Sequence, residues 1–228
     1  MSDEELFQRL IASDPTFLGR LGAYEERVRR FDDEAAPVLA DLWAAGVQVD
    51  ELNELRKPGA PLRAAVPVLA RWLPSLEYPP VKHDVVMTLG HAKGDAQAAR
   101  ALLAEFRRID PATDTDVTTG LRAAIGSALA MCATDEVADD LIELAADRHH
   151  GQHRLFVVLA LGNMKKRRAR AVSTLVELLE DDDVADCAVR ALVRLHAHEV
   201  RVHVEAMRDH ANPAVRAEVR AALKKWRT

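Results

Sequence analysis

The chain has few aromatic residues, only two cysteines, no long apolar run and no strong excess of charge. Phe, Trp and Tyr make up 4% of its 228 residues, whereas 49% of the residues are hydrophobic. With so few aromatic side chains, the core must consist mainly of Ala, Leu and Val, a mixture that suits closely packed helices better than sheets. We therefore expect an all-α protein.

The chain also lacks the apolar segments that membranes and secretion require. No run approaches the ~18 to 20 apolar residues of a membrane span, and the start, "MSDEELFQRL", is acidic, unlike a signal peptide. The only cysteines are Cys132 and Cys187, both in apolar surroundings. In a chain without a secretion signal we expect reduced core thiols and a cytoplasmic location.

The charge balance excludes a strong global attraction to nucleic acid or to an anionic membrane. The formal net charge is −5, from 31 basic and 36 acidic residues, so no single sign dominates. The two halves differ, because residues 1–114 carry 14 basic and 19 acidic residues and residues 115–228 carry 17 of each. Any basic surface is therefore expected in the second half.

Recognisable catalytic patterns are missing as well. The segment "GHAKGD" (90–95) follows a predicted helix and lacks the spacing of a phosphate-binding loop. We find no nucleophile elbow, no metalloprotease helix and no pair of CxxC motifs. The sequence therefore predicts no catalytic residue, no cofactor and no metal site, and we expect a protein that is not an enzyme.

What the sequence does contain is an internal repeat. Five apolar runs align on one leucine each, and these anchor leucines are Leu89, Leu129, Leu161, Leu192 and Leu223. Their separations are 40, 32, 31 and 31 residues, so a period near 31 recurs. Each run is preceded by a second apolar segment with helical spacing, as in "AVSTLVELLED" (171–181). The repeating unit is therefore a helix, a turn and a second helix.

Neither helix of such a unit can bury its apolar stripe alone, so successive pairs must stack. This predicts a right-handed α-α superhelix, or solenoid, of about five to six helical pairs. We expect a single solenoid domain over residues 1–228, with an N-terminal helical cap over 1–33 and repeats over 34–228. Ser2 and Glu5 form a capping-box pattern at the start of that cap.

Two segments carry a family resemblance: "TLVELLEDDDVADCAVRALVRL" (174–195) and "HANPAVRAEVRAALKKW" (210–226). Both resemble HEAT repeats, in particular the short phycobilisome-lyase HEAT-like type, in their acidic or Asn-Pro turn, apolar-Arg pair and Ala-rich second helix. The resemblance covers residues 62–226 and is weaker over 34–56, where "PVLADLWAAG" (37–46) echoes "PVLARWLPSL" (67–76). It implies a helical scaffold and carries no chemistry of its own.

A basic column is the first candidate binding surface. Seven residues before four of the anchor leucines stand Lys82, Arg122, Arg154 and Arg216. Because second helices of such arrays line the concave face, these side chains would form a stripe along it. The resemblance also implies the alternative, in which an arginine at this position pairs with a turn Asp such as Asp181. Both roles remain open from the sequence.

The histidine-rich turn "DRHHGQHR" (147–154) is the second candidate. The alignment makes it about three residues longer than the corresponding turn of the next repeat, and His149 and His150 lie on this extension, whereas His153 occupies a position that is otherwise apolar. An ordinary solvated turn, a recognition loop and a metal site are all conceivable, but the sequence offers no carboxylate or cysteine to complete a metal site.

A charge run, "KKRRAR" (165–170), lies between two repeats and is expected to be a solvated loop that could also contact phosphate or an acidic protein. Together these features predict a non-enzymatic module that binds an unidentified protein partner on its concave face. The alternative is nucleic-acid binding or base repair, as in the helical-repeat DNA glycosylases, which would need aromatic and carboxylate residues on a basic groove. Few residues here match that pattern.

Overall fold

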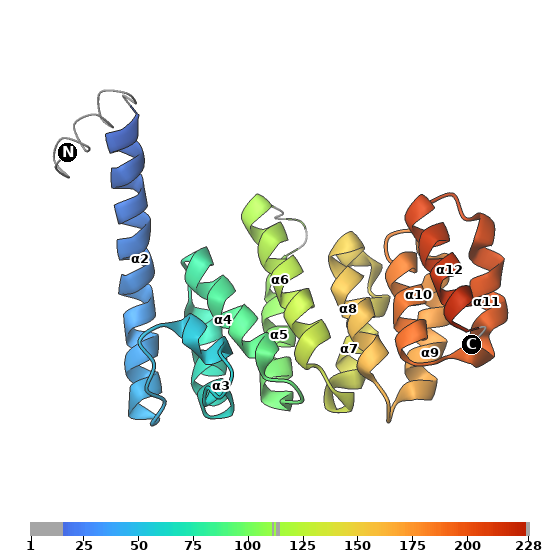
Figure 1. The fold of residues 1–228 in the computed structure, drawn as a ribbon, viewed down its shortest axis with the longest axis horizontal. Helices are drawn as coiled ribbons and strands as arrows, with labels where there is room; N and C mark the ends of the chain where they lie inside the picture. The colour runs from blue at the N-terminus through green and yellow to red at the C-terminus, as the bar shows by residue number, and fades with distance from the viewer. Residues whose placement is uncertain (1–15, 111, 113–114, 227–228) are drawn as a thin grey trace, which may run out of the picture.

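The computed structural model describes residues 16–110, 112 and 115–226, and every regular element within these ranges is an α-helix or a 3₁₀-helix. The helices are stacked side by side along one direction, with the first and the last described helix at opposite ends of the array (Figure 1). This arrangement confirms the predicted all-α superhelix. The capping-box pattern of Ser2 and Glu5 lies outside the described residues.

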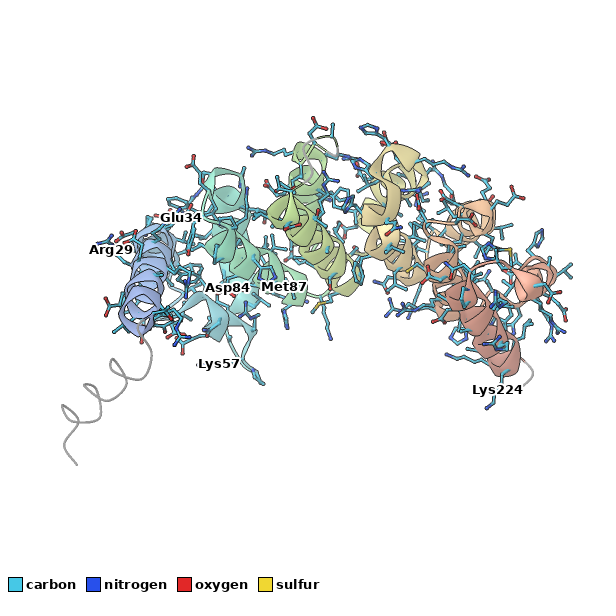
Figure 2. All side chains as sticks on the ribbon, turned by 90° about the horizontal axis from the view of Figure 1, so that it is seen from above. Arg29, Glu34, Lys57, Asp84, Met87 and Lys224 are labelled. Atoms are coloured by element: carbon cyan, nitrogen blue, oxygen red, sulfur yellow. The ribbon has the colours of Figure 1, made fainter. Side chains whose placement is uncertain are left out.

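Five helix pairs form the repeats of the described chain. The first helices are α3 (Leu62–Trp72), α5 (Ala96–Arg108), α7 (Ala138–Ala146), α9 (Arg168–Glu177) and α11 (Arg201–Ala206). The second helices are α4 (Pro79–His91), α6 (Asp116–Cys132), α8 (Leu155–Ala160), α10 (Ala185–Arg194) and α12 (Pro213–Lys225). Each second helix packs against the second helix of the next pair. The stacked pairs follow a curve whose concave side is lined by the second helices (Figure 2).

The core has the composition that the sequence predicts. All five anchor leucines are buried, four within second helices and Leu161 directly after α8, and Ala128, Ala160, Ala191 and Ala222 are buried one residue before four of them. These small residues let neighbouring second helices approach closely. A Cβ atom built on Gly90 of α4 would lie 2.8 Å from the Cα atom of Ala128 in α6, so this contact tolerates no side chain.

Local sequence explains where several helices begin. The Asp95 side chain accepts hydrogen bonds from the backbone of Gln97 and Ala98 at the start of α5, and Thr115 forms a capping box with Thr118 at the start of α6. Pro79 and Pro213 occupy first-turn positions of α4 and α12, where a missing N–H group costs nothing. No helix among the described residues is long and apolar enough to cross a membrane.

The N-terminal helix α2 (Phe17–Ala44) corrects two expectations. The predicted boundary between residues 33 and 34 falls inside this continuous helix. The segment 37–46 is also not the first helix of a repeat, because Asp41 contacts Arg71 and Trp72 while Glu34 contacts residues 77 and 78. Residue numbers therefore fall along α2 as they rise from the end of α3 to the residues just before α4. Between successive first helices the residue numbers rise together, as the contacts of Arg100 with Glu136 and Arg107 with Asp140 show. The helix α2 is an end cap over the first pair.

Candidate binding surface

Arg154, in the predicted basic column, is fully buried at the start of α8. Its Nε atom donates to the Gly151 carbonyl at 3.0 Å, and its Nη1 atom donates to the Ala145 carbonyl at 2.8 Å. Its Nη2 atom donates to the Asp181 carboxylate at 2.9 Å. One guanidinium therefore joins the end of α7, the turn of its own repeat and the turn of the next repeat.

The other members of the column are also bound internally. Arg122 is fully buried, and its Nη2 atom donates to the Asp110 carbonyl at 2.7 Å. The Lys82 ammonium pairs with Glu105 of the next first helix at 2.5 Å, and both side chains are largely buried. Arg216 donates to the carbonyls of His210 and Ala211 at 2.7 and 2.8 Å.

The column is therefore a structural linkage and not an exposed stripe, which corrects the binding role considered from the sequence. The physical reason lies in the spacing. Seven residues are nearly two turns of an α-helix, so a side chain seven positions before a buried leucine points to the same, inward side.

Asp181 shows how this linkage is balanced electrostatically. Burial alone would raise the pKa of its carboxyl group, but the hydrogen bond and the positive charge of Arg154 act in the opposite direction and lower the pKa below its ordinary value. The Arg148 Nε atom lies 3.4 Å from the same carboxylate and adds to this effect. The pair therefore stays ionised in its buried position.

The histidine-rich turn forms two short 3₁₀ turns, together η5 (Arg148–Arg154), which a kink at Gly151 separates. Gly151 has φ +48° there, a value that favours glycine. His149 is exposed and His153 is partly buried. His150 is buried, and its ring meets Phe106 edge-on with the ring centroids 5.3 Å apart.

These three histidines do not form a common site in the structure. His150 faces the interior near Asp147, with 3.6 Å between its Nε2 atom and the Asp147 carboxylate, whereas His149 is exposed to solvent. Among the described residues, no group of three or more His, Cys, Asp or Glu side chains is arranged to hold a metal ion.

The two cysteines are separate buried thiols, as expected for core residues. Burial raises the pKa of Cys132 to about 12 and that of Cys187 to about 11. A thiol with so high a pKa is a poor nucleophile at neutral pH, because only the thiolate reacts.

Several residues of the charge run 165–170 form ion pairs or hydrogen bonds with neighbouring repeats. Arg168 pairs with Glu199 of the following repeat at 2.6 Å, and Arg170 pairs with Asp139 of the preceding one. The Asp135 carboxylate accepts the backbone N–H groups of Lys166 and Arg167. Similar pairs join Arg107 of α5 to Asp140 of α7 and Arg71 of α3 to Asp41 of the cap helix α2. The run is thus mainly a connection on the outer side of the solenoid.

The concave face presents a different set of side chains, which were not predicted from the sequence. Apolar residues of three successive second helices stay half-buried or exposed: Met87 of α4, Met131 of α6, and Leu155, Phe156 and Leu159 of α8. Figure 2 shows Met87 on this concave side. Met87 and Leu159 lie two residues before an anchor leucine, and Leu155 lies six residues before one. These offsets point away from the buried face of the helix, and they were the signal by which the sequence could have identified these residues.

The same face becomes basic towards the C-terminal end. The second helices α10 and α12 carry exposed positive side chains, namely Arg190, Arg194, Arg220 and Lys224. Lys224 lies on the concave side in Figure 2. None of the four forms an ion pair with another described residue. The concave face therefore combines an apolar middle with a basic end.

Comparison with known proteins identifies no family for the chain. No protein-family model matches the chain, and no curated protein sequence does either. Among solved structures, a designed armadillo repeat protein in complex with the peptide (KR)4 is 18% identical over 77% of this chain and 90% of that chain, with a TM-score of 0.46. Two engineered proteins are 18% and 19% identical over 78% and 77% of this chain, each with a TM-score of 0.42. The alignments cover 52% of the first engineered protein and 87% of the second.

Proposed function

We propose that the chain is a non-enzymatic helical-repeat scaffold that binds a partner protein on its concave face. The observation that supports this most directly is the set of apolar side chains of α4, α6 and α8 that stay half-buried or exposed, because apolar residues left at the surface of a folded protein often mark an interaction site. The buried and internally bonded state of Arg122 and Arg154 moves the proposed binding surface from the predicted column to these side chains.

The partner segment that fits this face has two parts. Apolar side chains would pack on Met87, Leu155 and Leu159, and acidic residues would meet the positive charges of α10 and α12. Of the histidines considered from the sequence, only His149 is fully exposed, at the far end of a turn, and we propose no contact for it.

We further propose that the repeats belong to the short HEAT-like type and act as one continuous solenoid. The Arg154–Asp181 pair supports this, because it links the second helix of one repeat to the turn of the next in the manner that the resemblance implies. Separate buried thiols at Cys132 and Cys187 support a reducing, cytoplasmic environment.

Selection from a displayed peptide library tests the proposal and requires no identified partner. The immobilised full-length protein should enrich peptides that combine apolar and acidic residues, and these should lose affinity by about tenfold or more for a Leu159→Asp variant. The matched control is Val202→Asp, which places the same charge on an exposed apolar residue of the first helix α11 and should leave affinity unchanged.

The proposed surface would be overturned if the selected peptides lost equal affinity for both variants, or if neither variant weakened their binding. The nucleic-acid alternative rests on the basic end alone, and a labelled DNA duplex tests it in parallel. Salt-dependent duplex binding that is abolished by Arg190→Glu and Arg194→Glu, together with no enriched peptide, would favour that alternative.

A further inference from the structure

The cap helix α2 carries an apolar stripe that continues beyond the surface it buries. Ala35 and Leu42 are buried against the first pair, whereas further towards the N-terminus Phe31 is half-buried and Val28 and Tyr24 are 40% and 57% exposed. All lie on neighbouring turns of one helix face. The helix extends beyond the first pair, as Figure 1 shows. The exposed half of this stripe has no packing partner among the described residues that would explain it.

The row of second helices is incomplete at this end. Every second helix from α6 to α12 packs against a preceding second helix, but α4 has no preceding second helix and on that side contacts the short 3₁₀ segment η1 (Leu52–Arg56) and α2. Arg56 fixes η1 to α4 by an ion pair with Asp84 at 2.5 Å. Five residues of 3₁₀-helix span only about 10 Å, so η1 covers part of the side of α4 that a whole helix would cover.

A groove lies in the uncovered space. One part, of about 470 Å³, is bounded by Phe31, Ala35 and Leu39 of α2, by residues 50–53 and by Asp84 of α4. A second part, of about 320 Å³, lies between Tyr24 and Val28 of α2 and Tyr78 and Pro80 at the start of α4. Phe31 and Asp32 line both parts. From Tyr24 to Leu39 the stripe is about 22 Å long, which is the length of four helical turns.

The charges around the larger part have one sign. Asp32, Asp50 and Glu51 are exposed at its rim, and none of these three forms an ion pair with another described residue. Among the described residues, no basic side chain lines this part. Arg27 lines the smaller part, where its guanidinium lies 5.9 Å from the centre of the Tyr24 ring. The apolar floor thus has an acidic rim at the end near η1.

We infer that this groove, the α2–η1 groove, binds an amphipathic helix of a partner protein whose apolar face is flanked by Lys or Arg. Such a helix would pack on the stripe of α2, extend the row of second helices beyond α4, and place its positive charges beside Asp32, Asp50 and Glu51. The N-terminal residues 1–15 fit this requirement poorly, because they contain four acidic residues and one basic residue. This site is separate from the proposed concave surface.

Fluorescence anisotropy with a labelled 18-residue peptide of Leu and Lys in helical amphipathic order tests the inference on the full chain. A peptide with the same Leu positions and Glu in place of Lys is the charge control. We expect the Lys peptide to bind at least about tenfold more tightly than the Glu peptide. The double variant Asp50→Lys and Glu51→Lys should remove this preference, and Ala36→Arg, which places a long side chain in the groove, should weaken binding of the Lys peptide.

Matched variants separate this site from a general charge effect and from the concave face. Glu177→Lys and Glu180→Lys change the net charge equally on exposed residues of another repeat and should leave binding unchanged, as should Leu159→Asp. The inference is overturned if both peptides bind equally, if the Glu177 and Glu180 variants weaken binding as much as the groove variants, or if a synthetic peptide of residues 1–15 competes efficiently. Self-association of the unlabelled protein that Ala36→Arg abolishes would identify a second copy as the occupant and would equally overturn it.

Discussion

At the scale of single residues, the buried guanidinium of Arg154 is the clearest case of a side chain whose role depends on its surroundings. It satisfies two carbonyl groups and one carboxylate at once, so its removal leaves the buried Asp181 charge with only the exposed Arg148 as a cationic partner. Removal of one partner of a buried pair is far more costly than loss of an exposed pair.

We therefore expect Arg154→Met to lower the free energy of unfolding by about 3 kcal/mol, measured by urea denaturation. Arg148→Met, which removes an exposed arginine 3.4 Å from the same carboxylate, should cost less than about 1 kcal/mol. The double variant Arg154→Met with Asp181→Leu should recover part of the loss. If the two single variants cost the same, the proposed linkage between repeats is wrong.

His150 makes stability depend on pH. Burial lowers its pKa below the ordinary value; the charge of Asp147 opposes this shift, and Arg122, His149 and Arg154 add to it. Below about pH 6.5 the unfolded chain therefore binds a proton that the folded chain does not. Folding stability should fall as the pH decreases from about 7.5 to about 5.5.

The variant His150→Leu should show a smaller fall over this pH range than the unmodified protein, measured by thermal unfolding at each pH. His149→Gln, in the exposed neighbour, is the control and should keep the full dependence. A pH dependence that is the same in His150→Leu and in the unmodified protein would show that other groups are responsible.

At the scale of the helical elements, the close approach of second helices depends on small residues. Gly90→Val should lower stability by about 1–3 kcal/mol, because even its Cβ atom would collide with the backbone of Ala128. Gly120 of α6 has no atom within 4 Å of a built Cβ, so Gly120→Ala should raise stability by about 0.5–1 kcal/mol through helix propensity. Urea unfolding of both variants checks the pair, and destabilisation of equal size would contradict the packing argument.

Much of the arrangement of the helices is predictable from the sequence, because the anchor leucines recur and repeated helix pairs must stack to bury them. The position of the long turn before α8 also follows from the alignment. The direction of α2 does not follow, since "PVLADLWAAG" and "PVLARWLPSL" share an apolar pattern that is the same in parallel and antiparallel helices. That direction is fixed by the contacts of Asp41 and Glu34 across 31 and 44 residues of chain.

The candidate surface was predicted less well, because the sequence does not show directly which side of a helix each residue occupies. The recurring Lys and Arg residues are conspicuous in the alignment, but their spacing from the leucines places them inward, where charge is useful only as a link. The half-buried apolar residues Met87 and Leu159 look like ordinary core residues in a sequence. Only the relative position of neighbouring helices separates the two groups.

At the scale of the whole molecule, a stacked array can open one repeat at a time. Cys132 in α6 and Cys187 in α10 are buried thiols in different repeats, so each reports local opening at its own place. In single-cysteine variants made by Cys187→Ala and Cys132→Ala, we expect a thiol reagent to label Cys187 faster than Cys132, because α10 lies nearer an end of the array. Full denaturation should equalise the two rates, and equal rates in the native protein would indicate opening of the array as one unit.

The two sides of the curved array differ mechanically. On the inner side, Gly90 and Ala128 bring helix backbones into direct contact, and such contacts cannot be compressed further. On the outer side, long side chains such as Arg107 and Asp140 span the gap between neighbouring repeats, and they can fold up or extend at little cost. The array is therefore stiff against tighter bending and compliant towards flattening, so a ligand wider than the hollow can be accommodated whereas a narrower one cannot be gripped by closure.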